Sequence, residues 1–292
     1  MKWRAIFVVA AALFRVTAAT AEYAKLSPDL TLYYEEAGSG SLAIVFIPGW
    51  TMSSEVFELQ LAHFAGSTRF RAIAYDPRGQ GRSTKTLDGH TYQQHGRDLS
   101  ALIAHLKLEQ IVLVGWSSGV NDQLSYLNQF GASKLKGLVI LDGAPRATGD
   151  DNKKEWVWYR RDDRDGARGQ FTVPLLEDRA ATNKGFAEWM LEAATQENVR
   201  WVDEIMRQTP DSIAALTNET GAYVDYEADL IGQHGKLPLL IVVRAEWERV
   251  VTEWRDRHAP SARIVAMGKH MMFWERSAAF NAELDAFLER VP

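Results

Sequence analysis

The chain has no cysteine among its 292 residues. Disulfide bonds and cysteine-ligated metal sites are therefore excluded, and the fold must be held together by its apolar core. Positively charged residues are also fewer than negatively charged ones: 33 Lys and Arg against 38 Asp and Glu give a formal net charge of −5. A chain of this sign does not attract nucleic acid, so no nucleic-acid partner is expected.

No hydrophobic run near the N-terminus is long enough to cross a membrane. The run from Ala5 to Phe14 has ten residues, whereas a bilayer span needs about 20. Lys2 and Arg4 precede this run, and Ala19-Thr20-Ala21 follows it as a small-x-small cleavage motif. This order is typical of an export signal. We therefore predict a signal peptide over residues 1–21, cleavage after Ala21, and a periplasmic or secreted protein without stable membrane insertion.

Short apolar or β-branched runs recur along the chain between segments of helical periodicity. Several runs lack the alternation of a half-exposed strand, so we expect strands that are buried on both faces. Helices between such strands predict an α/β fold, in which a mostly parallel sheet is covered by helices on both faces. The expected strands are Leu30–Tyr34, Ile44–Ile47, Ala72–Tyr75, Ile111–Val114, Leu138–Leu141, Leu239–Val243 and Ile264–Ala266, and the expected helices are Ser54–Phe64, Tyr92–Lys107, Val120–Phe130 and Ser277–Leu288.

The strand pattern stops between about Arg146 and Gln233. Amphipathic and aromatic-rich segments replace it there, which predicts a helical insertion after the sixth strand. The expected domains are thus a core of residues 22–145 and 234–292 and a helical cap of residues 146–233. The rings of the cap either form a small core of their own or line a lid over an apolar substrate pocket.

The most informative motif is Gly115-Trp116-Ser117-Ser118-Gly119. It follows the expected strand Ile111–Val114 and precedes a helical stretch, so the serine stands at a sharp turn between strand and helix. Small residues are needed two positions either side of such a serine, because the backbone crowds its neighbours there. The turn also places the hydroxyl at a helix N-terminus, where free N–H groups can hold an oxyanion. The motif therefore predicts a nucleophile elbow.

From about Leu30 to the C-terminus the chain resembles the α/β-hydrolase fold. The loop Tyr75-Asp76-Pro77-Arg78-Gly79-Gln80-Gly81-Arg82-Ser83 resembles that of the esterases and non-haem haloperoxidases of this superfamily. In the family, a serine nucleophile, an Asp or Glu, and a histidine follow one another along the chain. His270, just after the last expected strand, is the only one of the seven histidines in the family's position. The resemblance thus implies that Ser117 is activated by His270.

Two residues compete for the role of the acid that orients His270. Glu248 lies after the expected strand Leu239–Val243, in the region where many relatives carry their acid. However, Trp247, Val250, Val251 and Trp254 have helical spacing, so a helix begins almost as soon as that strand ends. Asp142 ends the strand Leu138–Leu141, 25 residues after the serine, where some branches of the family carry the acid. We favour Asp142, because the helix that begins near Glu248 leaves little loop in which a catalytic carboxylate could lie.

An oxyanion hole in this family takes one backbone N–H from the residue after the nucleophile and one from the loop after the third strand. These residues are Ser118 and, in the segment Ile47-Pro48-Gly49-Trp50, Trp50. Pro48 replaces the histidine of many relatives, and Gly49 still permits the turn.

The residues together predict a serine hydrolase that cleaves carboxylic esters or lactones of apolar or aromatic molecules through an acyl-enzyme on Ser117. Ser117, Asp142 and His270 would form the triad, and no metal or cofactor is expected. Two alternatives stay open. The Pro-Gly-Trp loop and the acid on the sixth strand also resemble cofactor-free dioxygenases, in which a His-Asp pair deprotonates a heteroaromatic substrate. A non-catalytic ligand-binding member of the fold is the other alternative.

Overall fold

A computed structural model describes residues 19–163 and 168–291. Most of the predicted signal peptide, residues 1–18, lies outside the described residues. Thr20 and Ala21 form the first two positions of strand β1 (Thr20–Ser27), where Thr20 pairs with Glu36. Cleavage after Ala21 would therefore shorten the edge of the sheet by two residues.

The centre of the molecule is an eight-stranded sheet in the order β1-β2-β4-β3-β5-β6-β9-β10. The strands β1 and β2 and the strands β2 and β4 pair antiparallel, and all other neighbours pair parallel. Every predicted strand is present, and β1, which is mostly exposed, is the one strand of this sheet that periodicity did not predict. The strands after β1 span Leu30–Gly38 (β2), Leu42–Ile47 (β3), Phe70–Tyr75 (β4), Gln110–Trp116 (β5), Leu135–Leu141 (β6), Leu239–Val243 (β9) and Arg263–Ala266 (β10).

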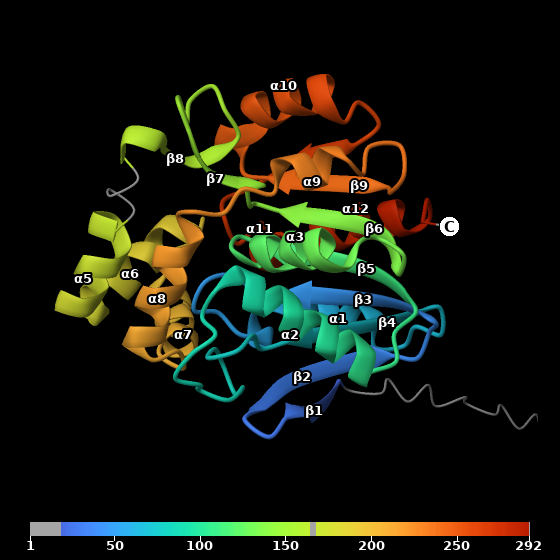
Figure 1. Cartoon of the computed structure of the whole chain (residues 1–292), viewed down its shortest axis with the longest axis horizontal. Helices are drawn as coiled ribbons and strands as arrows, with labels where there is room; N and C mark the ends of the chain where they lie inside the picture. Colours follow the sequence, from blue (N-terminus) through green and yellow to red (C-terminus); the bar gives the residue numbers. More distant parts are fainter. Residues whose placement is uncertain (1–18, 164–167, 292) are drawn as a thin grey trace, which may run out of the picture.

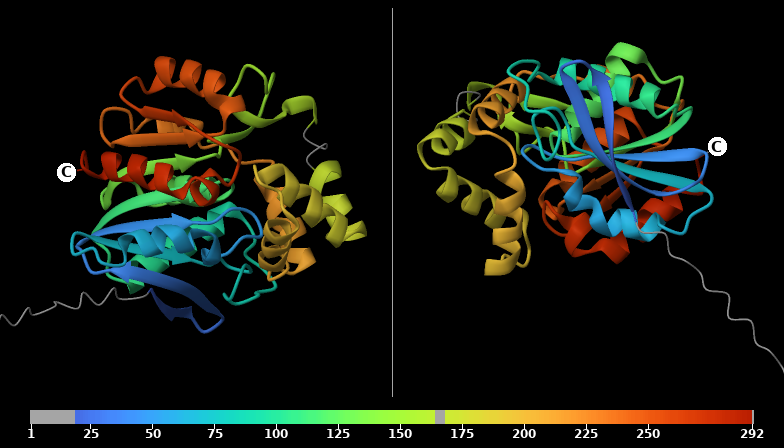
Figure 2. Two further views of the ribbon diagram at one scale, coloured as in Figure 1. Left: turned by 180° about the vertical axis from the view of Figure 1, so that it is seen from behind. Right: turned by 90° about the horizontal axis from the view of Figure 1, so that it is seen from below.

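Helices cover both faces of this sheet, which confirms the predicted α/β-hydrolase fold class (Figures 1 and 2). The first face carries α2 (Tyr92–His105), α3 (Gly119–Phe130) and α10 (Glu248–His258). The second carries α1 (Glu58–Phe64), entered through the 3₁₀ turn η1 (Ser54–Phe57), together with α11 (Met272–Glu275) and α12 (Ser277–Leu288).

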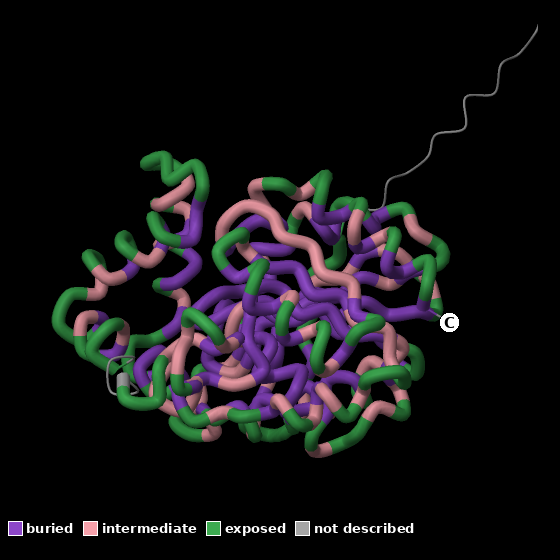
Figure 3. The backbone as a smooth tube through the Cα atoms, turned by 90° about the horizontal axis from the view of Figure 1, so that it is seen from above, coloured by how far each residue is buried: buried purple, intermediate pink, exposed green. Residues whose placement is uncertain are grey.

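The apolar core consists of two clusters, one on each face of the sheet. Every residue of β3 is buried, and its side chains alternate between the two clusters, with Val45 in one and Ile44 and Phe46 in the other. This explains the continuous apolar sequence Leu-Ala-Ile-Val-Phe-Ile, because neither face of the strand meets water. Figure 3 shows the buried residues concentrated along these central strands.

The segment between β6 and β9 differs from the prediction at its start. Instead of helices only, it begins with a parallel pair of short strands, β7 (Arg146–Gly149) and β8 (Val157–Arg160). The charged sequence around these four-residue strands lacks a strand-like period, so the pattern concealed them. After them come η2 (Arg161–Asp163), the π-helical turn η3 (Arg168–Thr172), α5 (Val173–Glu177), α6 (Arg179–Met190), α7 (Gln196–Met206), α8 (Asp211–Gly221) and α9 (Glu227–Ile231).

Helices α5 to α8 gather beside the end of the sheet toward which the parallel strands point (Figure 1). Ligand sites of α/β sheets form at this carboxyl end of the strands. None of the helices in the described chain combines the length and hydropathy of a bilayer span. The short 3₁₀ turn η4 (Ala245–Trp247) joins β9 to α10, so the predicted helix does begin almost at the strand end.

Candidate active site

Ser117 lies at the turn between β5 and α3, as the motif predicts. Its backbone is in the left-handed region, with a φ of 56°, a conformation that costs energy for a residue with a side chain. The flanking glycines permit this turn. A Cβ on Gly115 would lie 2.6 Å from the carbonyl oxygen of Gly119, and a Cβ on Gly119 would lie 2.3 Å from that of Ile47. The Gly-x-Ser-x-Gly spacing therefore follows from the close approach of β3, β5 and α3.

Asp142 is fully buried directly after β6, the strand beside β5. Its backbone N–H donates to the carbonyl oxygen of Val242 at 2.7 Å. Its Oδ2 lies 2.5 Å from Nδ1 of His270. An ionised carboxylate only accepts hydrogen bonds, so this pairing assigns the proton to Nδ1 and leaves Nε2 as an acceptor. The structure thus brings Asp142 and His270 together, whereas Glu248 is exposed at the start of α10.

His270 is held in the loop between β10 and α11, with 1% of its surface exposed. Its carbonyl oxygen accepts a hydrogen bond from the indole nitrogen of Trp116 at 2.9 Å. Its ring contacts three indoles, with centroid distances of 5.1 Å to Trp116, 4.8 Å to Trp189 and 5.9 Å to Trp158. Burial lowers the pKa of His270 and outweighs Asp142, which raises it, while the charge of Arg244 lowers the pKa further. The imidazole is therefore neutral near pH 7.

Arg244 is the residue of the site that the sequence reasoning missed. It is the first residue after β9, and its backbone N–H donates to Oδ1 of Asp142 at 2.9 Å. Its Nη1 donates to Oδ2 of the same carboxylate at 2.8 Å. Burial alone would raise the pKa of Asp142, but the hydrogen bond from His270 and the charge of Arg244 prevail and lower it. Arg244 thus helps to keep Asp142 ionised although the carboxylate is inaccessible to solvent.

Three indoles surround the guanidinium of Arg244. The ring centroids of Trp247, Trp158 and Trp189 lie 3.8, 5.2 and 5.4 Å from its Cζ, within the range of cation–π attraction. These rings come from α6, β8 and η4, which are far apart in the sequence. The one signal in the sequence was that an arginine stands immediately after β9, in the region where many relatives carry their acid.

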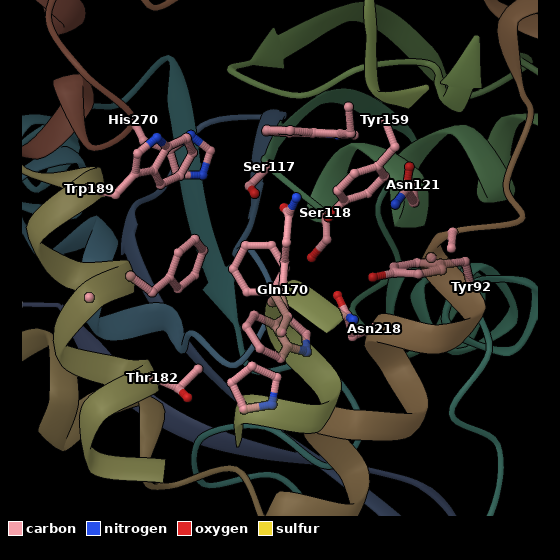
Figure 4. A pocket seen from close by; sticks show the side chains of 18 of the residues that line it. Tyr92, Ser117, Ser118, Asn121, Tyr159, Gln170, Thr182, Trp189, Asn218 and His270 are labelled. Carbon is pink, nitrogen blue, oxygen red and sulfur yellow. The ribbon is translucent and has the colours of Figure 1, made fainter. Parts of the chain in front are cut away.

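Ser117 and His270 line the same cavity, but in the described chain no hydrogen bond joins the serine hydroxyl to the imidazole. Hydrogen bonds between nucleophile and base are often long without substrate and shorten when it binds. Figure 4 shows Ser117 in the pocket, with His270 and Trp189 toward one end and Tyr92 and Asn121 toward the other.

The two predicted oxyanion donors also lie at this cavity. Within the described residues, the backbone N–H groups of Trp50 and Ser118 donate to no protein acceptor. The loop that carries Trp50 is clamped by Gln80, whose Oε1 accepts from the N–H of Thr51 at 2.9 Å and whose Nε2 donates to the carbonyl oxygen of Met52 at 2.9 Å. The loop that carries Gln80 is recognisable in the sequence as a family feature, but no local pattern indicates that Gln80 reaches the loop of Trp50.

The cavity measures about 700 Å³ and joins the sheet to the inserted segment. Aromatic rings from both parts form its apolar walls, and uncharged amides and hydroxyls complete the lining. Among the described residues, Arg244 is the one lining residue with a permanent charge, and no carboxylate lines the cavity. The lining residues are Trp50, Tyr92, Ser117, Ser118, Asn121, Trp158, Tyr159, Gln170, Phe171, Pro174, Ala181, Thr182, Gly185, Phe186, Trp189, Asn218, Gly221, Ala222, Arg244 and His270.

No group of three or more His, Cys, Asp or Glu side chains is placed to hold a metal ion in residues 19–163 and 168–291.

A serine at a strand–helix elbow, with a His-Asp pair at the carboxyl end of a mostly parallel sheet, is the arrangement of the α/β hydrolases. The sequence profile described as the alpha/beta hydrolase fold matches residues 43–292, and the chain belongs to this family. The predicted family is thereby confirmed.

Sequence relatives are enzymes of the predicted branch. A non-heme haloperoxidase of Rhodococcus erythropolis is 34% identical over 119 residues, which are 41% of this chain and 43% of that protein. A bifunctional esterase/perhydrolase of Acinetobacter calcoaceticus is 27% identical over 124 residues, 42% of this chain and 45% of that protein. The matched regions therefore span less than half of either relative.

Solved structures share the fold over nearly the whole chain. A bromoperoxidase from Bacillus anthracis has a TM-score of 0.82 at 21% identity, covering 92% of this chain and 100% of that one. An esterase from Exiguobacterium antarcticum has a TM-score of 0.78 at 22% identity, covering 89% and 96%. At such identities the likeness establishes the fold alone.

We predict that His270 titrates below the usual histidine pKa of 6.5, because burial disfavours the imidazolium. Asp142→Asn removes the group that raises this pKa, so the pKa should fall further. NMR titration of the imidazole signals, assigned with a His270→Gln variant, measures both values. A His270 signal that titrates above pH 6.5 in the unaltered protein would contradict the expectation.

Proposed function

We propose that the protein is a serine hydrolase that cleaves carboxylic esters or lactones of apolar or aromatic molecules through an acyl-enzyme on Ser117. The observation that carries the proposal is the buried Asp142–His270 hydrogen bond of 2.5 Å, which holds His270 in the wall of the cavity that Ser117 also lines. A serine hydroxyl becomes an effective nucleophile when an imidazole accepts its proton, and the imidazole needs a carboxylate to fix its tautomer.

In the proposed reaction, Oγ of Ser117 attacks the carbonyl carbon while its proton moves to Nε2 of His270. Asp142 stabilises the resulting imidazolium through Nδ1. The carbonyl oxygen becomes an oxyanion, and the N–H groups of Trp50 and Ser118 stabilise it. The bond to the leaving oxygen then breaks as His270 returns the proton to that oxygen. Water, deprotonated by His270, hydrolyses the acyl-enzyme and releases the acid.

The walls of the cavity support an apolar or aromatic substrate. Trp50 packs edge-on against Phe171 and Phe186, at centroid distances of 5.6 and 5.7 Å. Phe186 in turn stacks on Trp189, with an angle of 9° between their planes. We propose that residues 146–233 act as the lid of this cavity, since they supply Phe171, Phe186 and Trp189.

Export of the protein through the N-terminal signal stays a prediction.

A second candidate is cofactor-free dioxygenase-like chemistry on a heteroaromatic substrate. It is favoured by one feature: the His270–Asp142 pair is complete, whereas the serine hydroxyl forms no hydrogen bond to His270 in the described chain. In that reaction the pair would remove a proton from the substrate, molecular oxygen would be the oxidant, and Ser117 would not attack.

A fluorophosphonate probe and short-chain nitrophenyl esters test the proposal. Wild-type protein should become labelled and should release nitrophenol, and Ser117→Ala should lose both, because the bond-forming oxygen is gone. Ser41→Ala serves as the matched control, because Ser41 is exposed and does not line the cavity. Turnover of an aromatic substrate that consumes oxygen and survives Ser117→Ala would favour the dioxygenase, and failure of the wild type to react would refute the hydrolase.

The assignment of the acid has its own test. Asp142→Asn should lower kcat by about 10⁴-fold, because the amide cannot hold the productive tautomer of His270. Glu248→Gln should leave kcat nearly unchanged, since Glu248 is exposed on α10. Steady-state kinetics with a nitrophenyl ester measures both. The assignment is wrong if the two variants show the reverse order.

Gln80 should matter for the oxyanion donor although it does not line the cavity. Gln80→Ala frees the loop of Trp50 and should lower kcat by about 10- to 100-fold, somewhat less than outright loss of one oxyanion donor. Gln93→Ala, an exposed glutamine of α2, is the control. If the Gln80 variant raises KM and leaves kcat unchanged, the loop is not acting on the transition state.

A further inference from the structure

Arg244 has hydrogen-bonding capacity that its partnership with Asp142 does not use. The carboxylate takes the backbone N–H and one N–H of Nη1. The Nη2 group donates to no protein atom in the described part of the chain, and Nε lies 4.0 Å from the nearest oxygen of Glu246, too far for a hydrogen bond. The side chain retains 13% exposure and lines the cavity. Arg244 therefore combines unused hydrogen-bond donors with a place in the cavity wall.

The charges around the cavity make Arg244 attractive to an anion. Two carboxylates accompany Arg244: Asp142 is fully buried, and Glu246, 4.0 Å from Nε, is 71% exposed to solvent, and neither lines the cavity. A ligand in the cavity can therefore contact the guanidinium of Arg244 but not the carboxylate of Asp142. The indole of Trp247, 3.8 Å from Cζ, holds the guanidinium in place, so little side-chain freedom is lost when it binds a carboxylate. The rings of Trp158 and Trp189, 5.2 and 5.4 Å from Cζ, lower the local dielectric constant, which strengthens an interaction between charges.

The position of Arg244 also selects one half of the substrate. His270 must face the leaving oxygen in order to protonate it, and the oxyanion donors lie on the other side of the reacting carbon, at Trp50 and Ser118. Arg244 belongs to the His270 side, because both are held by Asp142 and both contact Trp158 and Trp189. A group bound by Arg244 therefore belongs to the leaving half.

We propose, building on the hydrolase function above, that the substrate is an ester whose leaving half is an aromatic hydroxy-carboxylate, and that Arg244 binds its carboxylate while Trp158 and Trp189 contact its ring. The ester C–O bond breaks, the phenolic oxygen takes the proton from His270, and water completes the hydrolysis. The products are a carboxylic acid and the free hydroxyaryl carboxylate. Arg244 is then a specificity-determining residue in addition to a partner of Asp142.

Two matched esters test this assignment: 3-acetoxybenzoate, which is anionic, and 3-acetoxybenzamide, which is neutral and nearly isosteric. After correction for their spontaneous hydrolysis rates, the wild type should show a kcat/KM about 10- to 100-fold higher for the anionic ester, the range expected for a hydrogen-bonded charge pair. Arg244→Met should bring the ratio to one or below, and Arg244→Lys should give an intermediate ratio. Arg249→Met, at an exposed arginine of α10, should keep the wild-type ratio.

The ratio of kcat/KM for the two esters shows whether Arg244 binds the substrate or only supports Asp142. Arg244→Met also loosens Asp142 and will slow both esters, so an unchanged ratio at lower activity would show that Arg244 acts on Asp142 alone and would overturn the inference. A wild type without preference would overturn it too, while hydrolysis of the neutral ester would leave the proposed function intact.

Product binding gives a measurement that does not depend on turnover. Calorimetry with Ser117→Ala should show 3-hydroxybenzoate binding at least about tenfold more tightly than 3-hydroxybenzamide, and equal affinities would refute the assignment. This experiment decides the question even if neither ester is hydrolysed or Arg244→Met does not fold.

Discussion

The site depends on one buried carboxylate that accepts hydrogen bonds from two sides. Asp142 receives the imidazole N–H of His270 on Oδ2, the backbone N–H of Arg244 on Oδ1, and the guanidinium on Oδ2. A lone carboxylate with no exposed surface would be costly to ionise, and these donors offset that cost. Without them Asp142 would take up a proton, and His270 would lose the acceptor that fixes its tautomer.

This arrangement follows from the order of the strands. The strands β5, β6 and β9 are parallel neighbours, so the residues that follow them, Ser117, Asp142 and Arg244, emerge at one edge of the sheet. The turns after β5 and β6 both begin with a residue in the left-handed region, which directs the chain sharply away from each strand. The elbow and the acid are thus placed by backbone geometry, and the loop after β10 brings His270 to them.

Much of this could be predicted from the sequence, because the information was local. Unbroken apolar runs marked the inner strands, and the Gly-x-Ser-x-Gly spacing marked the elbow through a steric requirement. The helical period of Trp247, Val250 and Trp254 indicated why Glu248 is not beside His270. What periodicity did not predict was β1, a mostly exposed edge strand, and the short pair β7 and β8 within a charged stretch.

The role of Arg244 could not be predicted either, because its partners come from four separate parts of the chain. Asp142 follows β6, while Trp158, Trp189 and Trp247 belong to β8, α6 and η4. No spacing in the sequence relates these positions, and only the folded chain brings the three indoles around one guanidinium. The clamp by Gln80 was hidden for the same reason, since it joins loops about 30 residues apart.

Trp50 connects the inserted segment to the reacting centre. Its indole N–H donates to the carbonyl oxygen of Ala214 in α8 at 2.8 Å, while its main-chain N–H is one of the two oxyanion donors in the proposed reaction. If the proposed reaction takes place, a movement of α8 would shift Trp50 and with it the stabilisation of the oxyanion. In the proposed hydrolase, the position of the lid over the substrate and the formation of the acyl-enzyme would thus be coupled. Substitutions in α8 that favour a new substrate would then change kcat as well as KM.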